Sequence, residues 1–552
     1  MLPYLLPKLR DVFFMALFFA VIGFGPRLLN VDGDLGRHVT VGNYILDSGH
    51  IPTQDVFSHT MRGQPLTPHE WLADVFFALA HRLGGLGGVV WLCAALVALT
   101  FTLVMVQTWQ RGAGILVALG LALWAAAAAS LHFLARPHLW TMLFLALWAC
   151  GLETMRLGKP FRWYLLPLLM LVWANMHGAF IAGFVVWGAY VAGKFASGKE
   201  ASSRWLSSER NECNETTGQG GKGAGGNGWG TLLAVGALSL GATFLNPAGW
   251  HLWETTFGFL RNRYLVSHTA EYLPPNFHDP STWPFLGLVA LSVLVLALRG
   301  QRLPVTHALL LSGWTAMGLY STRNIPLYAV VVIPILGQMG RLAGSRWLSS
   351  ERSEHSEHSE HSEHSEHSER SERIETTGQE GKGASEVSEE SLQAAGLQAR
   401  LGAMEASLKG VLWPGVFMLL MGAALLSGAH LDFGGRGNVF LPEVFPVQAA
   451  EWLESHPQQG HVFNHFPWGG YLLYRFEGRL PVFIDGQTDF YGEALTREYE
   501  QVITQADGWP AVLAKYEVTW ALIPQGSPLV KALQAQGWQV LYEDATAVIV
   551  HE

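Results

Sequence analysis

Residues 86–108 read LGGVVWLCAALVALTFTLVMVQT and contain no Asp, Glu, Lys or Arg. A helix needs about 20 predominantly apolar residues to cross the hydrocarbon core of a bilayer. Lipid offers no partner to a backbone N–H or C=O, so a segment inside it must satisfy its own hydrogen bonds by forming a helix. This stretch therefore predicts a transmembrane helix.

The composition of the whole chain leads to the same class of protein. Of its 552 residues, 50% are hydrophobic and 14% are charged, whereas a soluble domain carries about 25% charged residues. We predict an α-helical polytopic membrane protein with about 11 transmembrane helices. The apolar runs lie near 12–29, 86–108, 113–131, 138–155, 163–176, 178–195, 229–245, 283–298, 304–321, 325–340 and 411–430.

The charges that flank these runs predict an orientation. The first run follows Lys8 and Arg10 and has no small-residue cleavage site, so we expect a retained anchor with a cytoplasmic N-terminus. Alternation from there places Arg111 and Arg156 on the cytoplasmic side of a cell (inner) membrane, as the positive-inside bias requires. The extracytoplasmic segments would then be 30–85, 246–282 and 431–552.

The predicted transmembrane region comprises residues 1–430. Two kinds of segment, one after this region and one within it, differ from its apolar runs. From 431 to 552 a helical run, FPVQAAEWLESH, and short β-rich runs such as HVFNHF, PVFID and TAVIV predict a small extracytoplasmic α/β domain. The segments 196–228 and 341–410 share the sequence SRWLSSER and predict disordered cytoplasmic inserts. The second contains a Ser-Glu-His repeat; a His-rich tract can bind metal, but this one has no apolar residue to pack.

Charge and cysteine content exclude some functions. The net charge is −9 and no long Lys/Arg block occurs, so the sequence does not predict a nucleic-acid partner. Cys93 and Cys150 lie in apolar runs and Cys213 in a Gly-rich loop, a pattern that predicts neither a disulfide framework nor a zinc site.

The first external loop begins with NVDGDLGRH, residues 30–38, which places Asp32, Asp34, Arg37 and His38 at the predicted water–lipid boundary. An Asp-x-Asp pair can hold a divalent cation such as Mg²⁺ or Mn²⁺, or one carboxylate can act as a general base. Asp-Gly-Asp is also common in plain turns. The spacing alone leaves both interpretations open.

The same loop contains a second polar group. Segment 70–83 has apolar residues at helical spacing but is too short to cross a bilayer, so it predicts a helix lying along the interface. His69 and Glu70 stand at its start. They either bind substrate or cap the N-terminus of that helix.

More ionisable residues recur at the external ends of the runs, namely Arg136, His177, Glu271 and Arg323. Such groups near membrane depth are costly and are kept mainly where they face a cavity or a partner. Arg136 and Arg323 suit a phosphate, because a guanidinium fork matches its oxygens, although each alone could anchor a helix at the interface. We predict that these residues form one polar, membrane-embedded site.

These features together resemble the GT-C class of polytopic membrane glycosyltransferases, which includes oligosaccharyltransferases, protein O-mannosyltransferases and aminoarabinose transferases. The shared features are the anchor, the external Asp-x-Asp loop, the helical bundle and the external C-terminal domain. Within that class, the motifs DGDLGRH, HEWLA, ANMHG, RNIPL and FIDGQTDFY are similar to a family of bacterial multi-span proteins usually treated as glycosyltransferases. This similarity covers nearly the whole chain except the two inserts.

The resemblance implies a polyprenyl-phosphate-linked sugar donor that enters from the membrane lipid, and an acceptor that the sequence does not identify. It nominates Asp34 as the base and Asp32 as its partner or as a metal ligand, and Glu271 is the second candidate carboxylate. The run HFPWGGY is loosely similar to the acceptor motif of oligosaccharyltransferases but lacks its Asp. Trp468 and Tyr471 within it either stack on a sugar or pack in a turn.

A glycosyltransferase is the leading functional hypothesis, and two alternatives remain. A transporter or flippase-like lipid or saccharide binder would place ionisable groups near the membrane midplane and show repeated halves. The apolar runs are nearly free of charge and show no such repeat. A non-catalytic envelope assembly protein would use the C-terminal domain as a docking surface. Asp485 and Asp489, which follow a predicted strand, are either functional or part of a turn.

Overall fold

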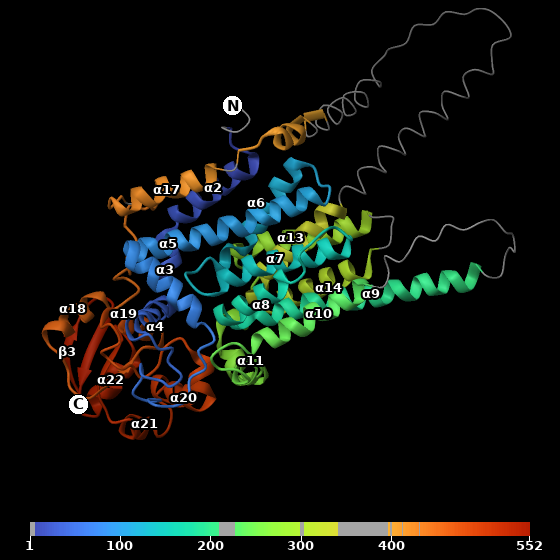
Figure 1. Ribbon diagram of the computed structural model, residues 1–552. Helices are drawn as coiled ribbons and strands as arrows, with labels where there is room; N and C mark the ends of the chain where they lie inside the picture. The colour runs from blue at the N-terminus through green and yellow to red at the C-terminus, as the bar shows by residue number, and fades with distance from the viewer. Residues whose placement is uncertain are drawn as a thin grey trace, which may run out of the picture.

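The computed structural model describes residues 6–208, 227–298, 303–339, 396–397, 400–410, 412–429 and 431–552. Much of the two predicted inserts, including the whole Ser-Glu-His repeat, lies outside these residues. The described chain forms a bundle of long helices with a smaller domain at one end (Figure 1).

The bundle consists of helices that coincide with the predicted apolar runs. They are α2 (Leu9–Gly23), α3 (Gly25–Asn30), α5 (Trp71–Gln110), α6 (Ile115–Ala129), α7 (His138–Arg156), α8 (Leu165–Met176), α9 (Ile181–Ser208), α10 (Asn227–Thr243), α13 (Trp283–Leu298), α14 (Val305–Tyr320), a helix over 325–339 and α17 (Trp413–Leu426). Among the described helices, four are long and apolar enough to cross a membrane, and others are apolar but shorter. The chain therefore has several apolar helices, and the number of crossings stays a prediction.

The first predicted run is interrupted. Helix α2 ends at Gly23 and α3 begins at Gly25 with Pro26 in its first turn. Proline lacks an N–H and its ring clashes with the carbonyl of the turn before it, so it starts a new helix more readily than it continues an old one. The short helix α3 ends at Asn30, two residues before Asp32.

Helix α5 bends at two glycines. Gly84 has φ −152° and Gly85 has φ +59°, a left-handed value that glycine adopts without strain. The bend separates residues 71–83, which carry the polar start of the helix, from the apolar residues that follow. The predicted short helix over 70–83 is thus a distinct arm of a longer element.

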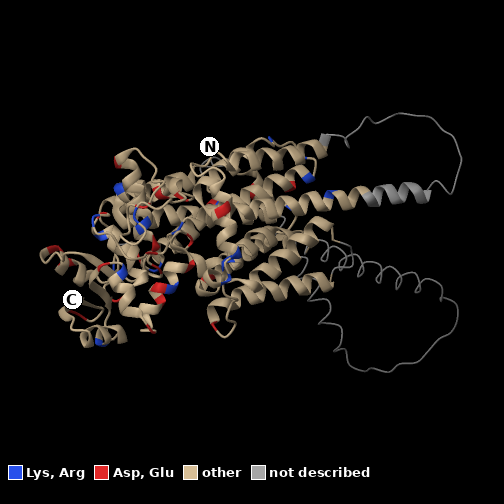
Figure 2. Ribbon diagram, turned by 90° about the horizontal axis from the view of Figure 1, so that it is seen from below, with Lys and Arg blue, Asp and Glu red and all other residues tan. Residues whose placement is uncertain are grey.

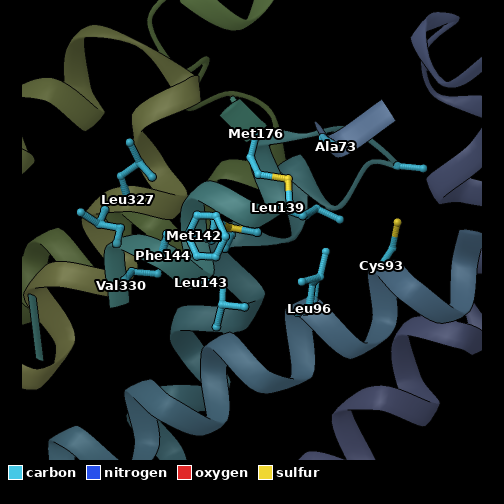
Figure 3. Close-up of a cluster of buried hydrophobic side chains, with 14 of the residues drawn as sticks. Ala73, Cys93, Leu96, Leu139, Met142, Leu143, Phe144, Met176, Leu327 and Val330 are labelled. Carbon is cyan, nitrogen blue, oxygen red and sulfur yellow. The ribbon is translucent and has the colours of Figure 1, made fainter. Parts of the chain in front are cut away.

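The core of the bundle is formed by apolar side chains from helices far apart in the chain. Figure 3 shows Leu96 of α5, Leu139 and Met142 of α7, and Leu327 of the 325–339 helix in one cluster. Leu139 and Met142 are buried to 0% and 1% exposure. Between helices in lipid, close van der Waals packing of this kind is the main stabilising contribution.

The C-terminal residues form an α/β domain with a four-stranded sheet in the order β1-β2-β4-β3. Strand β1 (His461–Asn464) pairs in parallel with β2 (Val518–Pro524), while β4 (Ala547–His551) is antiparallel to both β2 and β3 (Gln539–Glu543). The helices are α18 (Val447–Ser455), α19 (Gly469–Arg475), α20 (Thr488–Ile503), α21 (Trp509–Lys515) and α22 (Pro528–Ala535).

One β-rich run, PVFID at 481–485, does not join this sheet. Its Val482 instead makes an isolated parallel bridge to Ser58 in the first loop. The backbone N–H of Val482 donates to the carbonyl of Phe57, and the N–H of His59 donates back to Val482, both over 3.0 Å. The C-terminal domain is therefore joined to the first loop by main-chain hydrogen bonds.

The polar loops meet at one end of the bundle. Helices α4 (Asp34–Ser48) and α11 (His251–Arg261) lie beside the C-terminal domain at that end (Figure 1). Figure 2 shows that acidic and basic residues gather there, whereas the rest of the bundle is mostly uncharged. The three segments predicted to share a face of the membrane thus share an end of the molecule; which side of the membrane they face stays a prediction.

Candidate functional site

The Asp-x-Asp pair stands at the start of helix α4. Asp32 lies in the turn before the helix, and its Oδ1 accepts a hydrogen bond from the backbone N–H of Asp34 over 3.0 Å. Asp34 is the first residue of α4, where the unpaired N–H groups of the helix favour a carboxylate. The pair therefore does form a turn, as one of the two interpretations predicted, and the same turn holds both carboxylates near Arg136.

Arg136 gathers three carboxylates from two distant segments. Its Nε lies 3.2 Å from Oδ2 of Asp32, it also forms an ion pair with Asp34, and its Nη1 lies 3.6 Å from Oε1 of Glu271. The side chain of Arg136 is 23% exposed. One guanidinium thus holds three acidic groups at a partly open position.

Arg323 extends the cluster from the other side of Glu271. Its Nη1 lies 3.2 Å from Oε1 of Glu271 and donates to the hydroxyl of Tyr272 over 2.8 Å. The Nη2 group of Arg323 lies 3.1 Å from Nε2 of His177. Because Ser321 and Thr322 also donate to the carbonyl of Glu271, each over 2.9 Å, the two segments are held together by backbone as well as by charge.

His177 connects this cluster to the arm of α5. Its Nε2 lies 3.6 Å from Oε1 of Glu70, and its Nδ1 lies 2.8 Å from the hydroxyl of Thr141. His69 in turn lies 3.7 Å from Oδ2 of Asp489 at the start of α20. The predicted residues of the first loop, the bundle ends and the 246–282 loop therefore converge, and Asp489 joins them.

Arg37 and His38 lie one turn into α4 and are already paired. Arg37 donates from Nη1 to Oδ2 of Asp485 over 3.0 Å, and His38 Nδ1 lies 2.7 Å from Oδ1 of Asp74. Both residues line a small polar pocket beside the cluster. Its other polar lining residues are Thr67, His69, Glu70, Asp74 and Gln487.

Burial and neighbouring charges set the protonation of the carboxyl groups. Burial raises the pKa of Asp32 above its usual value, although Arg136 opposes this, and burial likewise raises the pKa of Glu70. Burial would also raise the pKa of Glu271, but Arg323 and Arg136 outweigh it and lower that pKa to about 2. The site thus holds one firmly ionised carboxylate beside acids with raised pKa values, an asymmetry typical of acid–base sites.

The predicted divalent cation has a competitor at the Asp pair. Both Asp32 and Asp34 contact the guanidinium of Arg136. Among the residues that the structure describes, no group of three or more His, Cys, Asp or Glu side chains is arranged to hold a metal ion. Arg136 therefore occupies the carboxylates at which a Mg²⁺ or Mn²⁺ ion would bind, and the divalent cation stays a prediction.

Trp468 and Tyr471 are buried in the hydrophobic core. They are 4% and 2% exposed. Trp468 donates from Nε1 to the carbonyl of Val444 over 2.9 Å, and the ring of Tyr471 packs 5.2 Å from that of Phe440. This corrects the predicted sugar-stacking role: neither ring presents a free face, and the packed-turn alternative describes both residues.

Sequence reasoning assigned no role to several residues that build the site. Tyr272 and Thr141 contact Arg323 and His177. The place of Asp74, which pairs with His38, could have been predicted from the sequence. Asp74 lies four residues after Glu70, a spacing that puts both on the same face of a helix. The contacts of Asp485 and Asp489 join far-separated parts of the chain and have no local signal.

No protein-family profile and no curated protein matches the chain. The structure is similar to ArnT from Cupriavidus metallidurans bound to undecaprenyl phosphate, with 16% identity, a TM-score of 0.44 and coverage of 98% of this chain and 97% of that one. It is also similar to the archaeal oligosaccharyltransferase AglB from Archaeoglobus fulgidus in complex with an inhibitory peptide and a dolichol-phosphate, with 10% identity, a TM-score of 0.49 and coverage of 93% and 69%.

ArnT and AglB are both GT-C glycosyltransferases, the class that the sequence motifs resemble. The identities are 10 to 16% and the TM-scores are below 0.5. The ligands bound in those structures are therefore findings about those proteins only.

Proposed function

We propose that the chain is a membrane glycosyltransferase that moves a sugar from a polyprenyl-phosphate donor to an acceptor at the extracytoplasmic face of a bacterial inner membrane. The observation that supports this is the cluster in which Arg136 contacts Asp32, Asp34 and Glu271, with Arg323 beside Glu271. It lies at the polar end of an apolar bundle, where a lipid-borne phosphate would arrive.

The two guanidinium groups are suited to the phosphate of the donor. Arg136 and Arg323 both contact Oε1 of Glu271, so a phosphate that enters between them competes with this carboxylate for two positive charges. Guanidinium forks bind phosphate oxygens in pairs of parallel hydrogen bonds. When Arg136 turns toward the phosphate, Asp34 loses its cationic partner and becomes a better proton acceptor.

Asp34 then acts as the general base. It takes the proton from an acceptor nucleophile while that atom attacks the anomeric carbon of the sugar. The bond between the anomeric carbon and the phosphate oxygen breaks, and its electron pair goes to the phosphate, whose new charge Arg136 and Arg323 stabilise. The products are the glycosylated acceptor, polyprenyl phosphate and a protonated Asp34.

The experiment that tests this proposal uses the purified full-length chain in lipid nanodiscs. Sugars linked to labelled undecaprenyl phosphate serve as donors and a bacterial envelope extract as the source of acceptor. Asp34→Asn should lower transfer at least about a hundredfold, the usual size of a general-base contribution. Asp47→Asn is the matched control, because Asp47 lies on the same helix but pairs with Arg82 at the surface. Unchanged transfer in Asp34→Asn would remove the assignment.

The position of the charges also bears on the transporter alternative. A translocation path would place ionisable groups near the middle of the bundle, whereas Arg136, Arg323 and the residues around them lie between or just before helices at its polar end. Movement of labelled lipid across a vesicle membrane, without any new glycosidic bond, would favour the transporter instead.

A further inference from the structure

Residues on both sides of Gly486 are fixed to helix α4 by one arginine. Arg37 donates from Nη1 to Oδ2 of Asp485 over 3.0 Å and from Nη2 to the side-chain oxygen of Gln487. Asp485 is fully buried, and its Oδ1 accepts from the backbone N–H of Gln487 over 2.9 Å. The short segment 485–487 of the C-terminal domain thus has a defined position against α4.

Asp34 faces the same segment. Residues three apart on a helix lie on one face, so Asp34 and Arg37 point toward the same neighbour. A Cβ atom built on Gly486 would overlap the carboxylate of Asp34, with Cγ of Asp34 only 2.5 Å away and Oδ2 3.1 Å away. Gly486 has no left-handed φ, so the need for glycine here is one of space. The carboxylate of Asp34 occupies the space that a side chain at position 486 would fill.

Helix α4 cannot move aside to make more room. Its Gly36 packs against Gly470, where an added Cβ would lie 2.7 Å from the carbonyl carbon of Gly470. On the other side of the same contact, a Cβ on Gly470 would lie 3.2 Å from the carbonyl carbon of Gly33. These approaches are backbone to backbone, so the start of α4 and the C-terminal domain are fixed relative to one another.

We infer that Gly486 is a positioning residue for Asp34, and that the C-terminal domain sets where this carboxylate stands relative to Arg136. The inference rests on the proposed function, in which Asp34 is the base. A methyl group at position 486 would push the carboxylate of Asp34 out of its place while leaving Arg136 and Arg323 where they are. The C-terminal domain then forms one side of the reaction site.

The test is a double-mutant cycle in nanodiscs with Gly486→Ala, Asp34→Asn and the combined variant. Displacement of a catalytic group by about 1 Å can cost a hundredfold in rate. We expect Gly486→Ala to lower kcat by about ten- to a hundredfold and to leave the affinity for undecaprenyl phosphate within twofold. Because Gly486 acts through Asp34, the combined variant should be no slower than Asp34→Asn alone. Additive losses would overturn the inference.

Stability measurements separate positioning from misfolding. Gly258→Ala in α11 is the control, since a Cβ there meets no atom within 4 Å. If Gly486→Ala lowers the Tm, then Asp34→Ala/Gly486→Ala should return to the Tm of Asp34→Ala, because the clash is with the Asp34 side chain itself. Failure of that rescue would contradict the contact. An active Asp34→Asn would refute the proposed function, whereas an inactive Asp34→Asn with a fully active Gly486→Ala would refute only this inference.

Discussion

Arg37 of α4 and Asp485 of the C-terminal domain form a buried ion pair, with Nη1 and Oδ2 3.0 Å apart and the two residues 448 positions apart in the chain. The side chains are 9% and 0% exposed. Two buried charges are tolerated because each neutralises the other. The pair therefore joins the helix that carries Asp34 to the C-terminal domain.

Removal of one partner of the Arg37–Asp485 pair should destabilise the folded protein. In Asp485→Asn the guanidinium of Arg37 stays buried without its counter-charge, which typically lowers the free energy of unfolding by about 3 to 5 kcal/mol. Thermal unfolding in detergent, compared with Glu454→Gln, measures this. Glu454 pairs with Arg475 at the surface, and its loss should cost less than about 1 kcal/mol. Similar Tm values for the two variants would contradict the importance of the buried pair.

Arg136→Gln should weaken the binding of undecaprenyl phosphate. The substitution removes the cation that contacts Asp32, Asp34 and Glu271 and leaves three carboxylates to repel a phosphate. A lost hydrogen bond to a charged group is worth about 1.5 to 3 kcal/mol, which corresponds to a ten- to hundredfold change in Kd. Titration of the labelled lipid into nanodiscs checks this against Arg82→Gln, which changes an exposed pair. Equal affinities would exclude Arg136 from the phosphate site.

The stability of the protein in acid should depend on Glu271. Arg323 and Arg136 lower the pKa of this carboxyl to about 2 from its ordinary value of 4.5. A depressed folded-state pKa stabilises the protein fully above pH 4.5, and the contribution is lost as the pH falls from 4.5 toward 2. The Tm difference between the unmodified chain and Glu271→Gln should therefore shrink across this range. A difference that stays constant with pH would disprove the ion-pair assignment.

Transfer should survive chelation. Arg136 already supplies positive charge to Asp32 and Asp34, so we expect treatment with EDTA to change the rate by less than about twofold. The measurement is the nanodisc transfer assay before and after dialysis, with readdition of Mg²⁺ or Mn²⁺. Loss of transfer that either ion restores would establish the divalent cation that the Asp-x-Asp spacing predicted.

Much of this arrangement could be predicted because membrane helices constrain it. Apolar runs give the helices, and their alternation assigns Asp32, Arg136, Glu271 and Arg323 to one end without any knowledge of packing. Charge within helices was harder to interpret. Glu153 of α7 lies in the bundle, 2.7 Å from Arg156 and 3.3 Å from His307 of α14. Both contacts stabilise the buried charge of Glu153, and the sequence does not reveal the second because Glu153 and His307 lie 154 positions apart.

The contacts of the C-terminal domain could not be predicted. The spacing of HFPWGGY is the same whether Trp468 faces a ligand or the core, and only the fold shows that the ring is buried. Gly486 gave no signal either, since a glycine next to an aspartate is ordinary in a turn. Its importance comes from Asp34, which approaches from the opposite end of the sequence.

The close packing of Gly36 on Gly470 has a consequence for biosynthesis. A nascent chain can insert its first helices early, yet the pocket around Asp32 and Asp34 stays unfinished until most of the polypeptide has left the ribosome. An incomplete translation product would thus lie in the membrane with acidic groups that lack their glycine neighbour. An unfinished copy would therefore lack the contact that we infer to position Asp34.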